Sequence, residues 1–227
     1  MKACVVQFAG SNCDLDTKHV LENVFDIETD LVFHKDRLEK KYDAIFIPGG
    51  FSYGDHLRPG AIARFSPVME DVINQANEDR LIVGICNGFQ VLCETKLLPG
   101  VLLRNKHMHF ICDDVNLTTS NRISGKLSKE VITLPIAHMD GNYFARPGTL
   151  KNIVENDQIF LRYSSKDGDT SRDHNPNGSS LNIAGITNEK GNIYGMMPHP
   201  ERASETELGN RDGQELLKAI FESFGGL

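Results

Sequence analysis

The chain has 227 residues, with 24 Lys and Arg against 31 Asp and Glu and a formal net charge of -7. That length suits one domain with a sizeable core, spanning residues 1–227, and the negative charge without any basic run argues against a nucleic-acid-binding protein. No apolar run approaches the ~20 residues that cross a bilayer, and the first residues turn polar too soon for a signal peptide, so we expect no membrane association. The five cysteines are odd in number and scattered, which is typical of a reducing compartment and predicts a cytoplasmic protein.

Short apolar runs alternate with helical patterns over the first hundred residues. Such runs have the length of buried strands, and Gly or Pro residues follow several of them. Strands that alternate with helices predict a parallel sheet covered on both faces. The expected strands are 2–8, 30–34, 42–47 and 81–85, and the expected helices are 14–25, 59–77 and the segment after residue 86.

From residue 100 the pattern changes to short strands separated by turns, which predicts an antiparallel or mixed arrangement. The polar segment 166–180 is rich in Asp, Asn, Gly and Ser and is expected to form a long surface loop. No repeat or linker divides the chain. The expected strands are 101–103, 109–112, 115–117, 131–134 and 159–163, followed by a hairpin of 183–186 and 193–197 and a final helix over 212–224.

The strand–turn–helix segment at residues 81–93 is the first candidate for chemistry. Gly84, Cys86 and Gly88 leave room only for a sharp turn, which lifts Cys86 clear of the sheet as a nucleophile elbow does. The start of the following helix directs unpaired N–H groups and a partial positive charge at the sulfur, which favours a thiolate. On this segment alone, a buried structural cysteine is an equally good interpretation.

Two further signals fall at expected carboxyl ends of strands, where α/β sheets bind their ligands. Gly49, Gly50 and Phe51 follow one strand, and their backbone N–H groups could face a developing oxyanion. His199 and Glu201 follow another and are two residues apart, which places both side chains on one side of an extended chain. A histidine oriented by a carboxylate is the base that a cysteine nucleophile requires. Each signal alone is more often an ordinary turn, but the three together predict a catalytic site.

Two other residues near these segments, His138 and Cys93, could also be given a catalytic or redox role. His138 is the main rival to His199 as the base, but it lacks a carboxylate two residues further on, although Asp140 is close. Cys93 lies seven residues beyond Cys86, too far along the helix for a redox pair, and is assigned to the core.

Charged and metal-ligating residues elsewhere give weaker signals. A possible metal set alternates along one expected strand without a second ligand pair, so we expect no bound metal. Three arginines are as compatible with a solvated surface as with contacts to substrate or partner. The metal set is His107, His109, Cys112 and Asp113, and the arginines are Arg58, Arg64 and Arg104.

Several longer stretches resemble a known family. Segments 48–51, 84–90 and 199–201 are similar to the class I (triad) glutamine amidotransferases. A more specific resemblance, to the glutaminase subunits of phosphoribosylformylglycinamidine synthase, covers essentially the whole chain. One departure is His138-Met139-Asp140-Gly141, where the family pattern is closer to His-Gly-Glu-Gly; this change keeps a carboxylate and affects the local turn. The stretches that carry this more specific resemblance are 48–60, 103–105, 135–138, 175–179 and 197–202.

This resemblance implies an α/β fold of the class I glutamine amidotransferase (flavodoxin-like) type. Such a fold is a three-layer sandwich with a mixed, largely parallel central sheet and a smaller antiparallel part in the second half. The resemblance further implies that the Cys86 thiolate attacks the side-chain amide of L-glutamine. His199 would protonate the departing ammonia and then activate water, while Glu201 orients the imidazole. Oxyanion and substrate contacts would come from Gly49, Gly50, Phe51, Asn87 and Gln90.

The implied partners are a separate synthetase subunit, which uses ATP and Mg, and a small accessory subunit. Ammonia would pass to the synthetase, which converts formylglycinamide ribonucleotide to formylglycinamidine ribonucleotide in purine biosynthesis. We expect no cofactor on this chain, which has no Gly-x-x-x-x-Gly-Lys-[Ser/Thr] motif, and low glutaminase activity without the partner. A stand-alone cysteine hydrolase or peptidase and a non-catalytic regulatory module with the same fold remain as alternatives.

Overall fold

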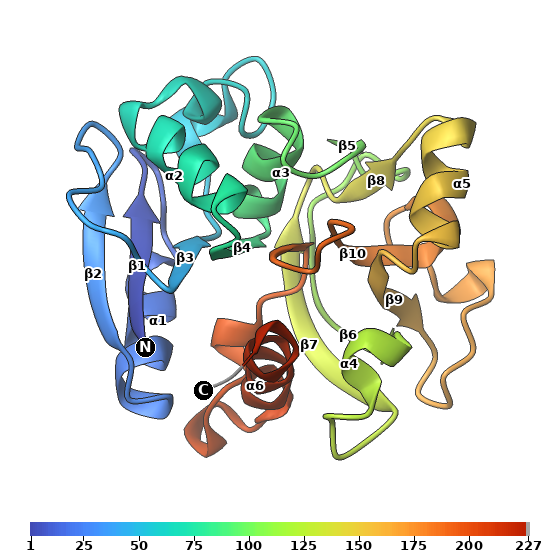
Figure 1. Ribbon diagram of the computed structural model, residues 1–227. Helices are drawn as coiled ribbons and strands as arrows, with labels where there is room; N and C mark the ends of the chain where they lie inside the picture. The colour runs from blue at the N-terminus through green and yellow to red at the C-terminus, as the bar shows by residue number, and fades with distance from the viewer. Residues whose placement is uncertain (226–227) are drawn as a thin grey trace.

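Nine strands, most of them buried apolar runs, form one sheet in the computed structural model, which describes residues 1–225 (Figure 1). A separate pair of short strands, β5 (Val101–Leu103) and β8 (Asn142–Phe144), forms a small antiparallel sheet. The strands of the large sheet are β1 (Lys2–Gln7), β2 (Glu28–Phe33), β3 (Ala44–Ile47), β4 (Leu81–Ile85), β6 (Ile111–Thr119), β7 (Val131–His138), β9 (Ile159–Ser164), β10 (Ile183–Thr187) and β11 (Ile193–Met196).

The large sheet is parallel in one half and antiparallel in the other. Its strand order is β2-β1-β3-β4-β11-β10-β9-β6-β7. The four pairs from β2 to β11 are parallel, and the four pairs from β11 to β7 are antiparallel. The predicted mixed sheet with an antiparallel second half is therefore confirmed, although the antiparallel part is as large as the parallel one. In the parallel half the order reverses between β1 and β3, which is the switch point where such sheets bind ligands at the carboxyl ends of their strands.

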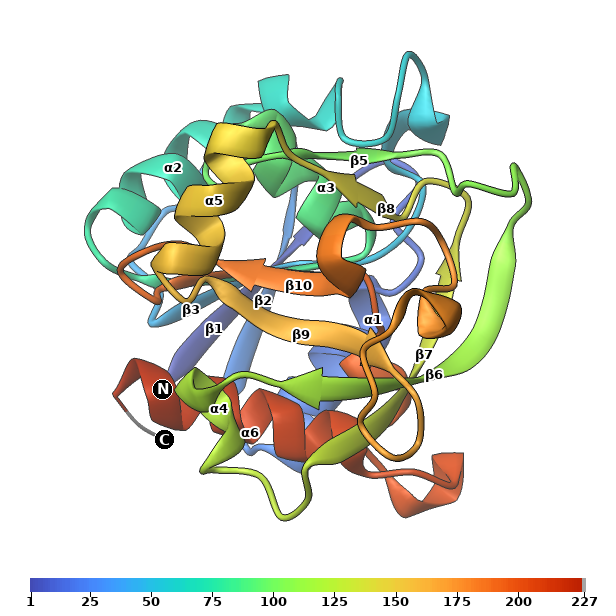
Figure 2. The same cartoon turned by 90° about the vertical axis from the view of Figure 1, so that its right-hand side faces the viewer.

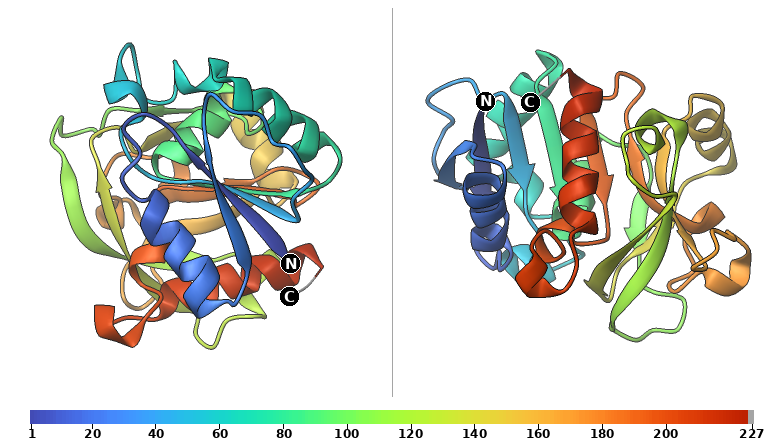
Figure 3. Two further views of the ribbon diagram at one scale, coloured as in Figure 1. Left: turned by 90° about the vertical axis from the view of Figure 1, so that its left-hand side faces the viewer. Right: turned by 90° about the horizontal axis from the view of Figure 1, so that it is seen from below.

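Helices cover both faces of the sheet (Figures 2 and 3). On one face lie α2 (Pro67–Asn77), α3 (Asn87–Glu94) and α5 (Pro147–Glu155), and on the other lie α1 (Asp14–His19), α4 (Asn121–Ser124) and α6 (Asp212–Phe224). The apolar stripe of α6 enters the core, where the Phe221 ring packs edge-on against Phe25 and Phe46. Burying one such ring stabilises the fold by about 1.5–3 kcal/mol. No helix within residues 1–225 is both long and apolar enough to cross a membrane.

Some elements of the structure differ from the expected ones. The helix expected over 59–77 begins only at Pro67, which occupies a first-turn position where its missing N–H is not needed. Helix α5 was not expected, although Pro147 marks its start in the same way. The strands expected at 109–112 and 115–117 are one continuous strand, β6, because β7 pairs with it from Ile111 to Thr118.

The polar segment 166–180 is fastened to the core by asparagine side chains. Asn177 is fully buried, and its Nδ2 donates to Gly141 O at 2.8 Å and to Tyr163 Oη at 3.2 Å. Asn182, just beyond the segment, donates to the carbonyl oxygens of Tyr163, Thr170 and Ser171. The surface loop therefore has a fixed path that reaches the turn after β7.

Candidate active site

Cys86 lies in the sharp turn between β4 and α3. Its backbone has φ 50° and ψ -103°, a conformation that is strained for any residue other than glycine. The Cys86 N–H donates to Met196 O at 2.7 Å, which ties the turn to the end of β11. Because α3 begins at Asn87, its first N–H groups have no acceptor within the helix and point toward the turn. This geometry is that of a nucleophile elbow, with the helix's positive end at the sulfur.

Glycine at two positions lets α3 approach the sheet closely enough to form this turn. A Cβ built on Gly88 would lie 1.9 Å from Ile47 O, and one on Gly84 would lie 2.7 Å from Gly88 O. Both contacts are with backbone, which has little freedom to move. The elbow therefore depends on backbone-to-backbone packing between β3, β4 and α3.

Replacing Gly88 with alanine is expected to displace α3 and with it Cys86. Forcing a methyl group against a carbonyl oxygen should lower the free energy of unfolding by about 3 kcal/mol, or roughly 6–12 °C in melting temperature. Thermal unfolding and a glutaminase assay provide the measurement. Gly148→Ala is the matched control, because Gly148 also lies near a helix start but a Cβ there meets nothing within 4 Å. Equal melting temperatures for the two variants would contradict the packing argument.

His199 and Glu201 reach the elbow because β11 pairs with β4. The register aligns Met196 with Ile85, so the chain after β11 emerges beside the residue after β4. His199 Nδ1 lies 2.6 Å from Glu201 Oε1, and each residue is 2% exposed. The Nδ1–H therefore donates to the carboxylate. His199 Nε2 is buried and has no hydrogen-bond partner within the described residues, which leaves it available to a reacting group.

The electrostatic surroundings of His199 favour its protonated form. Burial alone would lower its pKa, but the charges of Glu201 and of the Cys86 sulfur raise the pKa well above its usual value. The pairing of β4 with β11 brings Cys86 and the segment that carries His199 to the same edge of the sheet. The site can therefore hold an imidazolium between a carboxylate and a cysteine sulfur, which is the arrangement of a cysteine nucleophile with its acid–base partner.

Cys13 also contacts the imidazole, and sequence reasoning did not single it out. Its sulfur lies 3.8 Å from His199 Nδ1 and accepts a hydrogen bond from Arg202 Nη2 at 3.2 Å. The available signal was its position after β1, at the same edge of the sheet as Cys86. Cys13, His199 and Glu201 are the group of three metal-ligating side chains that residues 1–225 bring together. The candidate set His107, His109, Cys112 and Asp113 does not form such a group, and only its last two members lie on β6.

The Gly49–Phe51 turn lies against the imidazole, but its N–H groups are not equivalent. A Cβ on Gly49 would lie 2.6 Å from His199 Cε1, so this glycine makes room for the ring. The Phe51 N–H donates to Gly10 O at 2.9 Å and is therefore occupied in this conformation. The N–H groups of Gly50 and Asn87 remain the candidates for an oxyanion site.

Side chains at the start of α3 form a polar network beside the elbow. Asn87 Oδ1 accepts from the Ser52 N–H at 3.1 Å, and Asn87 Nδ2 donates to Gln90 Oε1 at 2.8 Å. Gln90 Nε2 in turn donates to Asp140 O at 2.7 Å. Partial burial and the nearby charge of Asp140 raise the pKa of Asp55 to about 6. Two carboxylates thus lie close together next to Asn87 and Gln90.

His138 has surroundings that suit a structural histidine. Its Nδ1 lies 3.1 Å from Asn105 Oδ1, and Asn105 Nδ2 donates back to His138 O at 2.9 Å. Burial, with a smaller contribution from the charge of His199, lowers the pKa of His138 to about 4. His138 is therefore neutral near pH 7 and is oriented by an amide, whereas His199 is oriented by a carboxylate.

The remaining candidates have mainly structural contacts. Arg58 makes a bidentate ion pair with Glu94, which also receives Arg64 at 3.8 Å. Arg104 lies 3.8 Å from Asp140 and so borders the polar network. Cys93 is buried in the core, as expected.

The fold and this site define a glutamine amidotransferase. A family model described as a CobB/CobQ-like glutamine amidotransferase domain matches residues 1–221. The chain is also 13% identical, with a TM-score of 0.57 over 98% of its length and 83% of the other, to a glutamine amidotransferase of known structure from Thermotoga maritima, which shows the shared fold.

Two proteins with higher sequence identity to this chain identify its family more specifically. The chain is 49% identical to phosphoribosylformylglycinamidine synthase subunit PurQ of Salinibacter ruber, over 96% of this chain and 93% of that protein. It superimposes with a TM-score of 0.84 and 40% identity on a chain in the structure of PurLQS from Thermotoga maritima, covering 97% of both chains. The chain belongs to the PurQ family.

Proposed function

We propose that this chain is the glutaminase subunit of phosphoribosylformylglycinamidine synthase and releases ammonia from glutamine for purine biosynthesis. The observation that carries the proposal is the buried His199–Glu201 pair, with its 2.6 Å Nδ1–Oε1 contact, at the strand end next to the Cys86 elbow. A peptidase or a non-catalytic module is less consistent with membership of the PurQ family.

Cys86, His199 and Glu201 have distinct roles in the proposed reaction. The Cys86 thiolate attacks the side-chain amide carbon of glutamine, and the imidazolium of His199 gives its proton to the nitrogen as the carbon–nitrogen bond breaks. Ammonia leaves, and the γ-glutamyl group remains bound to sulfur as a thioester. Neutral His199 then takes a proton from water, which attacks the thioester and releases glutamate. Glu201 holds the Nδ1–H throughout and stabilises the imidazolium.

Groups around the elbow supply the binding contacts. The N–H groups of Gly50 and Asn87 stabilise the oxyanion in both steps, and Gly49 keeps the imidazole within reach. The half-buried carboxylates of Asp55 and Asp140 attract the α-ammonium group of glutamine. Gln90 fixes the Asp140 turn through its 2.7 Å bond to the Asp140 carbonyl.

The chain works as part of a complex with PurL and PurS, and its 40% identity to a chain of the PurLQS structure from Thermotoga maritima supports this part of the proposal. The synthetase uses ATP and Mg and accepts the ammonia, and this chain needs no cofactor of its own. Glutaminase activity is low without the partners, because Cys86 is only 5% exposed in the isolated chain.

The remaining expectations also form part of the proposal. Residues 1–227 act as one domain, for which the sharing of a single large sheet by both halves of the chain is the support. The protein works in the reducing cytoplasm, which is consistent with five cysteines that form no disulfide within residues 1–225.

Two measurements test the proposal. The glutamine analogue 6-diazo-5-oxo-L-norleucine should alkylate Cys86, and mass spectrometry should locate the adduct there and not on the exposed Cys112. Glutamate release should rise when purified PurL and PurS are added with ATP, Mg and the ribonucleotide substrate. An adduct elsewhere, or a rate indifferent to the partners, would contradict the assignment.

A further inference from the structure

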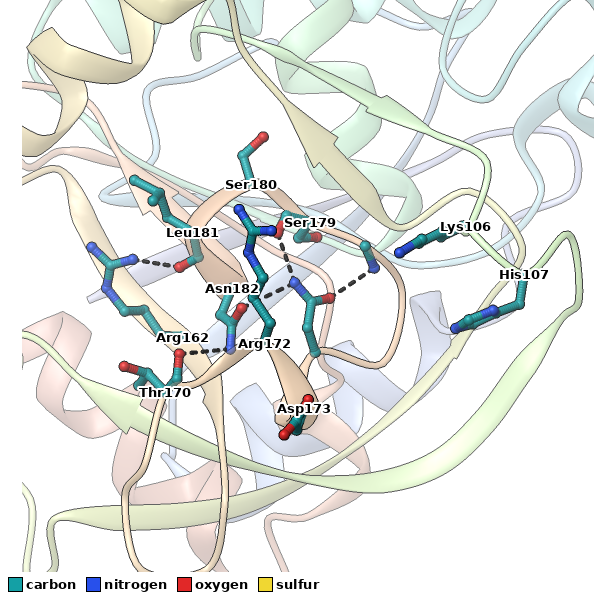
Figure 4. Close-up of a pocket in the computed structure, with 12 residues that line it drawn as sticks. Lys106, His107, Arg162, Thr170, Arg172, Asp173, Ser179, Ser180, Leu181 and Asn182 are labelled. Carbon is teal, nitrogen blue, oxygen red and sulfur yellow. Dashed lines mark hydrogen bonds between the residues drawn. The ribbon is translucent and has the colours of Figure 1, made fainter.

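A cavity of about 660 Å³ opens between the 166–182 segment, β9 and the loop after β5 (Figure 4). It is distinct from the Cys86 site, and none of the catalytic candidates lines it. Among its ionisable lining residues, basic side chains outnumber the one carboxylate. These residues are Lys106, His107, Arg162, Arg172 and Asp173.

Three cations of this lining have no counter-ion in the described part of the chain. Lys106, Arg162 and Arg172 make no ion pair there, whereas exposed residues such as Arg37, Arg58 and Lys190 do. Arg162 donates instead to the Leu181 carbonyl oxygen, and its partial burial lowers its pKa. A partly desolvated cation without an anion is unfavourable, so the cavity favours an anionic occupant.

The walls of the cavity are held in place before any occupant arrives. Asn175 Nδ2 donates to Ser179 O at 2.7 Å and to Asn182 Oδ1 at 3.0 Å. Leu181 and Asn182 both have positive φ, a conformation that persists only where the surroundings enforce it. A preorganised wall loses little entropy on binding, which is the property of a recognition site.

The same wall is hydrogen-bonded to the turn that carries His138. The Lys106 N–H donates to Asn177 O at 2.9 Å, and Asn177 Nδ2 donates to Gly141 O at 2.8 Å. The Gly141 N–H donates to Asn105 Oδ1, the atom that also contacts His138 Nδ1. A short chain of hydrogen bonds thus links the cavity wall to the His138 turn.

Exposed apolar side chains occur on the segments that line the cavity. Leu181, which lines the cavity, is 50% exposed, and Met108 and Phe110, which follow His107 in sequence, are 60% and 46% exposed. A free phosphate ion would leave these side chains in water. A protein segment would cover them, since exposed apolar residues beside charged ones are typical of protein interfaces.

We propose that this cavity is a docking site for an acidic segment of the synthetase complex, whose carboxylates pair with Lys106, Arg162 and Arg172. The inference rests on the proposed function, because it takes the partner from the PurQ assignment. The inference adds the surface through which this chain contacts its partner and the charged groups that form the contact.

Charge reversal tests the proposal. The double variant Lys106→Glu/Arg172→Glu changes two exposed side chains, and we expect it to bind the PurL–PurS partner about 10- to 100-fold more weakly at low salt. Raising the salt concentration should weaken the wild-type complex far more than the variant complex. Lys126→Glu is the matched control, because Lys126 is exposed, makes no ion pair within the described residues and lies in the turn between α4 and β7, outside the cavity. Calorimetric titration gives the dissociation constants.

A second measurement identifies the contact directly. A carbodiimide should join Lys106 Nζ to an Asp or Glu of the synthetase or the accessory protein in the assembled complex, and peptide mapping should find that link. Unchanged affinity of the double variant, or protection of Lys106 by inorganic phosphate but not by the partner, would overturn the proposal. Alkylation of Cys86 by 6-diazo-5-oxo-L-norleucine in the same variant separates the two proposals, because it reports on glutaminase chemistry without requiring docking.

Discussion

Replacing Cys86 with serine is expected to reduce glutamine hydrolysis by a factor of about 10⁴ or more while the fold survives. A serine hydroxyl is a far weaker acid than a thiol and a far weaker nucleophile toward an amide carbon, so the substitution removes the group that forms the thioester. Glutamate release by the complete complex, with glutamine as the nitrogen source, is the measurement. Activity with externally added ammonia should remain, because the synthetase reaction does not require the thiol.

The exposed Cys112 offers a matched control for this substitution. Cys112→Ser changes the same atom at a site with no expected role, and it should hydrolyse glutamine at the wild-type rate. The melting temperature of Cys86→Ser should fall little, since the side chain is nearly isosteric. Full glutaminase activity in Cys86→Ser with a wild-type melting temperature would refute the assignment of the nucleophile.

Replacing Glu201 with glutamine is expected to lower kcat by about 10²–10⁴ and to change the pH profile. The charge of Glu201 is the strongest of the influences that raise the pKa of His199, so its loss lets the imidazolium release its proton at lower pH. His199 must be protonated to expel ammonia, and the alkaline limb of kcat/KM should therefore move toward lower pH. A pH series of initial rates measures both effects.

A second His–Glu pair provides the control for this effect. His19 Nε2 lies 2.9 Å from Glu205 Oε2 on the surface, where the side chains are 51% and 30% exposed. Exposed pairs contribute little because water and salt screen them, whereas the His199–Glu201 pair is almost fully buried. Glu205→Gln should leave both the rate and the pH profile unchanged. An unshifted alkaline limb in Glu201→Gln would show that Glu201 does not set the protonation of His199.

Helices and turns that depend on local sequence patterns could be predicted. Helix α6 has the bounds expected from its apolar spacing, and the turn at Cys86 follows from the strand and the two flanking glycines. The unexpected α5 and the continuity of β6 depend on packing and pairing partners far away in sequence. A polar pair such as Asp113 and Asp114 reads as a turn in isolation but stays in a strand when β7 supplies the hydrogen bonds.

The same distinction applies to the site. His199 and Glu201 could be paired from their two-residue spacing, and strand ends indicated which segments would meet. The contact of Cys13 with the imidazole depends on how three strand ends converge, and the pattern of residues does not encode it locally. Likewise, the orientation of the Phe51 N–H toward Gly10 is set by a single peptide plane, which no residue type specifies.

Because β4 pairs with β11, the distance between Cys86 and His199 does not depend on how many residues separate these two strands in the sequence. Cys86 and His199 are far apart in sequence, yet each follows a strand hydrogen-bonded to the other. The chain between these strands contains most of the antiparallel half, including the wall of the cavity lined by Lys106, Arg162 and Arg172. Insertions and deletions in that stretch can occur during evolution without separating the nucleophile from its base. New contacts with other subunits can therefore arise on this scaffold while the chemistry is inherited unchanged.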